Sequence, residues 1–158
     1  MKIKNKLPLA GTLKVELLFP DGTRKLHWEE ENVITLPSKQ VLLAGLYLPN
    51  QVSDPINKLW VGTGGTIDPA GQFPKPVAQN MTNLYAPLVS VDTSYHVDNS
   101  MPAVTFIADL DQGTANGELI NEAGLFKVSG LMFNIKTFPA IPKTAEFAIH
   151  FAWTIEMA

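Results

Sequence analysis

The sequence predicts a mainly β protein: an antiparallel β-sandwich with one short helix and a long loop rich in Pro and Gly. Several segments alternate apolar and polar residues with the period of two that is typical of half-buried strands. Turn signals separate these segments at short intervals, and one segment alone has a good helix signature. Because 158 residues is the length of one domain, we expect a single sandwich domain over residues 1–158.

The first two predicted strands form a hairpin. Residues 13–19 alternate Leu, Val, Leu and Phe with Lys, Glu and Leu, which indicates one buried face. Pro-Asp-Gly at 20–22 then predicts a turn, because Pro fixes φ, Asp bonds the backbone and Gly accepts a positive φ. The turn leads into a strand at 24–28, and residues 32–36 predict a third short strand.

A helix is predicted over residues 38–48. Ser38 has the side chain of a good N-cap, and Pro49 ends the segment. Apolar residues nearly encircle the segment, so a helix here would be mostly covered. A buried strand is the alternative for the same residues.

The remaining strands are predicted at 57–61, 88–97, 103–110, 125–128, 131–138 and 145–155. The last has the clearest pattern, with a large apolar residue at every second position: Phe147, Ile149, Phe151, Trp153 and Ile155. This face is predicted to be core, where each large side chain contributes about 1.5–3 kcal/mol when it is buried. His150 lies on the other face without a legible partner, so we expect its loss to change stability little.

Residues 66–87 are poor in both the helix and the strand period and carry four prolines. Loops longer than about 12–15 residues are usually functional or disordered. This segment also holds apolar side chains that are costly to leave in water, namely Phe73, Val77, Met81, Leu84 and Tyr85. We expect a contact arm at about 66–87 in which these five residues form an interface.

The charge and the apolar stretches of the chain indicate which classes of partner to expect. The formal net charge is -3 and no run of basic residues is present, which argues against nucleic acid. No stretch approaches the roughly 18 apolar residues of a membrane span, and the N-terminal apolar stretch is too short for a signal peptide. Charged residues make up 17%, against a usual share of about 25%, and interface cores are depleted in charge. We therefore expect a protein that is made in the cytoplasm and assembles with other proteins, without membrane or nucleic acid.

No metal or cofactor site is predicted. The chain has no Cys, and none of His27, His96 and His150 has companions at metal-ligand spacing. Residues 62–65 read GTGG, but no Lys-Ser or Lys-Thr follows, so the phosphate-loop pattern fails. A glycine turn that ends a strand is the better interpretation.

Carboxylates are the remaining candidates for chemistry. Asp109 and Asp111 share a face at a strand end, and Glu118 and Glu122 follow across a turn, so an acid–base pair or a hard-cation site is conceivable in principle. Carboxylates at loop ends are common, and no aromatic platform for a sugar accompanies them. We expect no catalytic residues and therefore no enzyme.

Several segments share motifs with a known group of proteins. They read ENVIT at 31–35, LWVGTG at 59–64, NGELINEAGLF at 116–126, MF at 132–133, FPAIPKT at 138–144 and FAWTI at 151–155. Together they resemble structural proteins of tailed-bacteriophage particles, over most of the chain from Leu13 onward. The shared residues are turn and core signatures rather than catalytic residues.

The resemblance implies a non-enzymatic virion component. We expect symmetric copies at the tail, neck or fibre attachment, with other virion proteins as partners and the virion as the final location. A head-decoration protein is the alternative within this class. A carbohydrate-binding or depolymerising fibre module and a cytosolic binding domain are the alternatives outside it.

Overall fold

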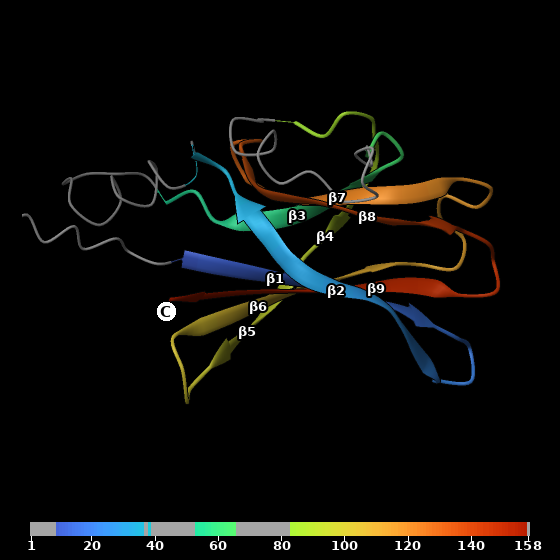
Figure 1. The fold of residues 1–158 in the computed structure, drawn as a ribbon, viewed down its shortest axis with the longest axis horizontal. Helices are drawn as coiled ribbons and strands as arrows, with labels where there is room; N and C mark the ends of the chain where they lie inside the picture. Colours follow the sequence, from blue (N-terminus) through green and yellow to red (C-terminus); the bar gives the residue numbers. More distant parts are fainter. Residues whose placement is uncertain (1–8, 37, 39–52, 66–82, 158) are drawn as a thin grey trace, which may run out of the picture.

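The computed structural model describes residues 9–36, 38, 53–65 and 83–157. Within these residues the chain forms nine strands in two antiparallel sheets of five and four strands, which lie one over the other (Figure 1). The predicted fold class, a mainly β antiparallel protein, is confirmed, and the layers have a sandwich-like arrangement.

The first sheet has the strand order β2-β1-β9-β6-β5, and the second has the order β4-β3-β7-β8. The strands of the first sheet are β1 (Leu9–Leu18), β2 (Arg24–Ile34), β5 (Ser94–Asp98), β6 (Ala103–Leu110) and β9 (Ala148–Met157). Those of the second are β3 (Ile56–Gly62), β4 (Pro87–Asp92), β7 (Leu119–Lys127) and β8 (Met132–Pro142).

Strand β2 joins the two sheets. It pairs with β1 over most of its length, and its last residues, Val33 and Ile34, pair with Ile135 and Asn134 of β8. A separate third strand at 32–36 was therefore a wrong prediction, because the backbone stays extended from Arg24 to Ile34. One long strand that changes partners makes the corner of the sandwich.

The predicted strand at 88–97 is also wrong in its extent. The structure divides it into β4 in the second sheet and β5 in the first, separated by Thr93. The N–H of Thr93 donates to the carbonyl of Asn57, 3.1 Å away. This bond fixes Thr93, where the chain passes from one sheet to the other, to β3. Strands β4 and β5 are the two ends of the strand order.

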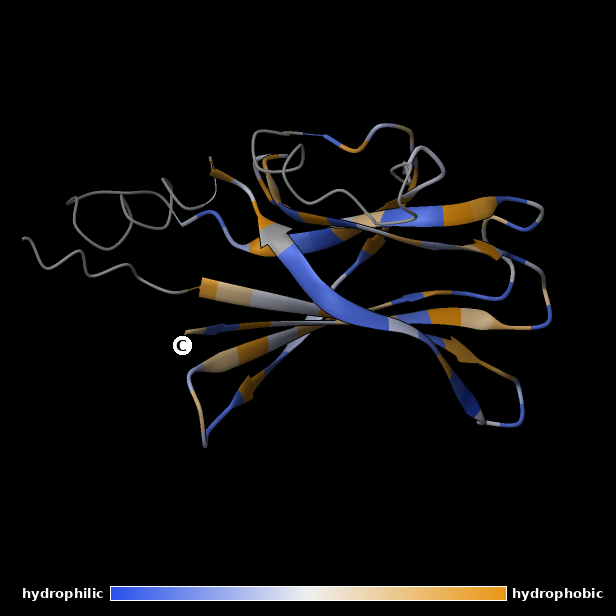
Figure 2. Ribbon diagram, viewed as in Figure 1, coloured by the Kyte–Doolittle hydropathy of each residue, from blue (hydrophilic) through white to orange (hydrophobic). Residues whose placement is uncertain are grey.

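The core lies between the two sheets, and the predicted aromatic face of the last strand is part of it. Ile149, Phe151 and Trp153 are fully buried, Phe147 is buried, and Ile155 packs against them half-buried. Figure 2 shows orange residues along β9, whereas the broad ribbon of β2 is largely blue.

The outer face of the second sheet carries a smaller apolar cluster. Phe126, Met132 and Ile135 are buried there with Leu84, and Trp60 packs beside them. Gly124 makes room for Leu84, because a Cβ on this glycine would lie 3.2 Å from Leu84 Cδ2. The segment before β4 thus covers this face, which explains why β7 is buried on both sides.

The predicted helix at 38–48 lies outside the described residues except for Ser38. Leu36 and Ser38 have helical backbone, but the N-cap is Thr35. Its Oγ1 accepts a hydrogen bond from the Ser38 N–H at 3.4 Å, three residues on, as an N-cap does. The hydroxyl of Ser38 is itself buried and donates to the carbonyl of Met132 at 3.0 Å.

Candidate functional site

The carboxylates that the sequence singled out do not meet in one site. Asp109 lies on the outer face of the first sheet, opposite His150 in the register of β6 and β9. Glu122 is fully buried on the outer face of the second sheet. Asp111 accepts a hydrogen bond from the Thr114 hydroxyl in the turn after β6, which lowers its pKa. Glu118 is exposed in the same loop. Asp109 and Glu122 lie on the outer faces of different sheets, so these two carboxylates do not form an acid–base pair.

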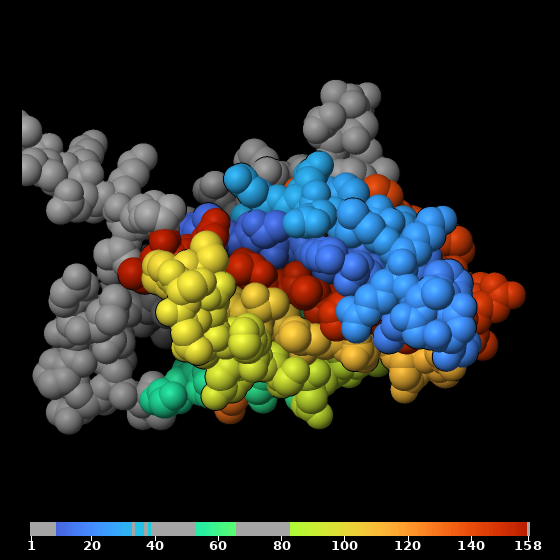
Figure 3. Space-filling view, turned by 90° about the horizontal axis from the view of Figure 1, so that it is seen from below, coloured from blue at the N-terminus to red at the C-terminus, as the bar shows by residue number. Residues whose placement is uncertain are grey.

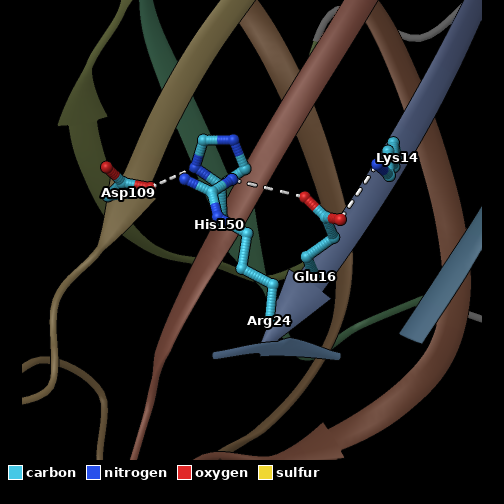
Figure 4. Close-up of polar contacts among 5 residues, drawn as sticks. All are labelled: Lys14, Glu16, Arg24, Asp109 and His150. Atoms are coloured by element: carbon cyan, nitrogen blue, oxygen red, sulfur yellow. Dashed lines mark hydrogen bonds and ion pairs between the residues drawn. The ribbon is translucent and has the colours of Figure 1, made fainter. Parts of the chain in front are cut away.

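A row of polar side chains crosses the outer face of the first sheet (Figure 4). His150 Nδ1 lies 2.5 Å from Asp109 Oδ1, so the expectation that His150 has no partner was wrong. On the neighbouring strand β1, Glu16 is paired with His150 in register. Lys14 Nζ lies 2.9 Å from Glu16 Oε1, and Arg24 of β2 lies 3.5 Å from Glu16 Oε2.

The row consists of two groups of contacts, Asp109 with His150 between β6 and β9, and Lys14 and Arg24 with Glu16 between β1 and β2. The hydrogen bond from Lys14 lowers the pKa of Glu16 most strongly, and burial acts against it. Each charged group in the row is held by a neighbour of opposite charge or by a hydrogen bond. We therefore assign the row to the stability of the sheet.

The glycine turn at 62–65 is hydrogen-bonded to side chains of β7. Glu122 Oε1 accepts hydrogen bonds from the N–H groups of Gly64 at 3.3 Å and Ala86 at 3.0 Å. Gly65 donates its N–H to Asn121 Oδ1 at 2.9 Å. Two of the backbone donors that a phosphate would need are already bound, so this turn fastens β3 and the start of β4 to β7.

The three histidines lie apart. His27 Nε2 contacts the Pro139 carbonyl at 2.7 Å, His96 is exposed on β5, and His150 binds Asp109. In the part of the chain that the structure describes, no group of three or more His, Asp or Glu residues could hold a metal ion.

The predicted interface residues fall into three groups. Phe73, Val77 and Met81 lie outside the described residues. Leu84 is buried in this protein's own outer cluster, because it packs over Gly124, and so it is not free to contact a neighbour. Tyr85 is exposed to 48%.

Five of the ten large apolar residues that are exposed in the described part of the chain lie on or beside the edge strands β4 and β5, which the sequence did not reveal. Tyr95 is exposed to 70%, and four more large apolar residues on or beside β4 and β5 are also exposed: Tyr85, Leu88, Val97 and Met101. A signal was present in the apolar residues of 88–97. The predicted strand at 88–97 does not distinguish an edge strand from a covered one, because both carry apolar residues in the same pattern.

A pocket of about 200 Å³ opens beside the outer cluster. It is lined by Trp60, Asn83, Leu84, Pro87, Phe126 and Gly130. Its walls are mainly apolar, and Trp60 and Phe126 meet edge to face with ring centroids 6.2 Å apart.

Comparisons with known proteins give no relative: no family model, no curated protein and no solved structure matches the chain. The described residues contain no helix long and apolar enough to cross a membrane.

Proposed function

We propose that this chain is a non-enzymatic structural component of a tailed-phage particle, and that it assembles in symmetric copies at the tail, neck or fibre attachment. The observation that carries the proposal is the exposure of two large apolar side chains on one face of the edge strand β5, Tyr95 and Val97. Tyr95 and Val97 are exposed to 70% and 47%, and such groups on a protein surface mark contacts with other proteins.

The motifs that resemble those of phage structural proteins support the proposal that the chain is part of a phage particle. Their residues have structural roles in the sandwich: Glu122 binds two backbone N–H groups, Lys143 is buried between two loops, and Trp153 is in the core. Symmetric closed assemblies are the usual outcome for repeated subunits.

Gold-labelled antibodies against this chain, applied to intact particles, test the location. We expect label at one end of the tail or at the neck. Label spread over the head would assign the chain to head decoration instead. Particles that stay unlabelled, while a denatured sample from the same preparation also fails to react, would contradict the proposal.

A further inference from the structure

Among the described strands, β5 is a free edge of the first sheet. It pairs with β6 on one side and ends the strand order on the other. Ser94, Tyr95, His96 and Val97 are all exposed. Figure 3 shows β5 and the yellow turn that follows it at the surface of the molecule. The backbone N–H and C=O groups on its outer side are therefore open to pairing with another strand.

The other edge strand, β4, has protection that β5 lacks. β4 begins at Pro87, its register with β3 shifts between Val61 and Gly62, and its far end carries the Lys58–Asp92 ion pair. Pro, irregular register and charge all discourage edge pairing. β5 pairs with β6 in unbroken register over its five residues and contains no Pro or Lys.

The side chains of β5 complement themselves in an antiparallel pair. A two-fold axis through His96, perpendicular to the sheet, places Tyr95 of each copy opposite Val97 of the other. The interface then contains two Tyr95–Val97 pairs. Aromatic and β-branched residues pair favourably across strands. Ser94 then lies opposite Asp98, so no carboxylate faces another.

We infer that two copies of this chain join through β5, antiparallel, about a two-fold axis at His96, so that their first sheets become one continuous sheet. The partner is a second copy, because in this register the same five residues supply both sides of every pair: Tyr95 with Val97, Ser94 with Asp98, and His96 with His96 on the axis. Contacts of one patch with itself are the rule in two-fold dimers.

The pairing is weak for an isolated pair of molecules. Five residues on each side bury less than the roughly 1,200–2,000 Å² of a stable interface. The inference therefore rests on the proposed function, because copies held close together on a particle gain the effective concentration that a short strand pair needs.

Single-cysteine cross-linking of the full chain tests the register, since the sequence has no Cys of its own. His96→Cys places two thiols opposite each other on the axis. Ser94→Cys is the matched control on the same strand and the same face. In the proposed register Ser94 lies opposite residue 98 of the other copy, so its two thiols are offset by four residues, or about 13 Å at 3.3 Å per residue. The reagent is a bismaleimide shorter than that offset, used at high protein concentration.

We expect His96→Cys to cross-link roughly tenfold faster than Ser94→Cys, and adding Tyr95→Ser to His96→Cys to remove most of that difference. A mixture of Ser94→Cys and Asp98→Cys should also cross-link. Equal rates for His96→Cys and Ser94→Cys would overturn the inference.

If β5 cross-links as expected but the chain is absent from particles, the proposed function fails alone. If the chain is in particles but β5 does not cross-link, the inference fails alone.

Discussion

The ammonium of Lys143 lies 2.9 Å from Oδ1 of Asn116 and joins two loops at one end of the sandwich. The same Nζ donates to the carbonyls of Gln112 at 3.2 Å and Thr144 at 2.8 Å. Lys143 is 1% exposed and its Nζ lies 5.7 Å from the centroid of the Phe147 ring. Burial lowers the pKa of Lys143, and the Asp111 carboxylate acts in the opposite direction.

Replacing Lys143 by Met should therefore destabilise the protein. The change removes the donor of three hydrogen bonds. Asn116 and Thr144 are exposed and can turn to water, so we expect a loss of about 1 kcal/mol, the net contribution of an ordinary hydrogen bond. Urea unfolding measures the difference. Lys25→Met, at an exposed position of β2, is the control and should stay within about 0.5 kcal/mol of the parent. Equal stability of the two variants would mean that the Lys143 contacts contribute nothing.

Trp153 is the residue whose truncation should cost most. It is fully buried at the centre of the core, so Trp153→Ala should lower the free energy of unfolding by about 3–5 kcal/mol. Trp153 Nε1 is buried and lacks a hydrogen-bond partner in the described part of the chain. Phe removes that unpaired donor and keeps a ring in place, so Trp153→Phe should cost clearly less. Denaturation of both variants gives the comparison, and a Trp153→Ala midpoint equal to that of the parent would refute the core assignment.

Gly124→Ala should be harmful although the change is small. A Cβ at this position would lie 2.8 Å from the Asn134 carbonyl oxygen and 3.2 Å from Leu84 Cδ2. The backbone oxygen cannot move away cheaply, and overpacking of this kind costs about 1–3 kcal/mol. Gly113→Ala is the matched control, because its nearest atom would be 3.6 Å away. Thermal unfolding of the two variants should separate them; similar melting temperatures would show that the strands adjust freely.

The pH dependence of stability should include a contribution from Glu16. Because the hydrogen bond from Lys14 lowers its pKa in the folded protein below the ordinary value of 4.5, the unfolded state binds the proton more readily. The stabilisation is fully present above pH 4.5 and is lost as the pH falls through the lowered folded pKa.

Glu16→Gln should therefore flatten the decline of stability between about pH 5 and pH 3. Chemical denaturation at a series of pH values measures this. Glu29→Gln removes the same charge at an exposed position of β2 and provides the reference profile. A Glu16→Gln profile as steep as that of the parent would exclude Glu16 as a contributor.

Most strands could be predicted from the sequence, but not all of their bounds and not their assignment to sheets; β7, for example, begins at Leu119, six residues before the predicted start. Alternation marks a strand such as β9 because one of its faces is buried. The same pattern does not say which neighbour a strand will choose. Neither Pro nor Gly stands between residues 88 and 97, so nothing local signalled the change of sheet at Thr93.

The buried charges could not be predicted either, for a different reason. Lys136 is 3% exposed and lies with its Nζ 3.1 Å from Glu30 Oε2 and 4.8 Å from the centroid of the Trp28 ring. A lysine in a strand normally marks the exposed face, and only the fold brings Glu30 and Trp28 to it. The exposed Tyr95 is the reverse case, because an apolar residue on an edge strand has the sequence pattern of a core residue.

Copy number in purified particles tests the central claim most directly. Mass spectrometry with isotope-labelled peptides from this chain, compared with those of the other particle proteins, gives the number of copies per particle. A structural component of the tail, neck or fibre attachment predicts a few to a few tens of copies in a symmetric multiple. Hundreds of copies would contradict the position and assign the chain to head decoration. Its absence from particles that infect normally would contradict the claim that it is a component of the particle.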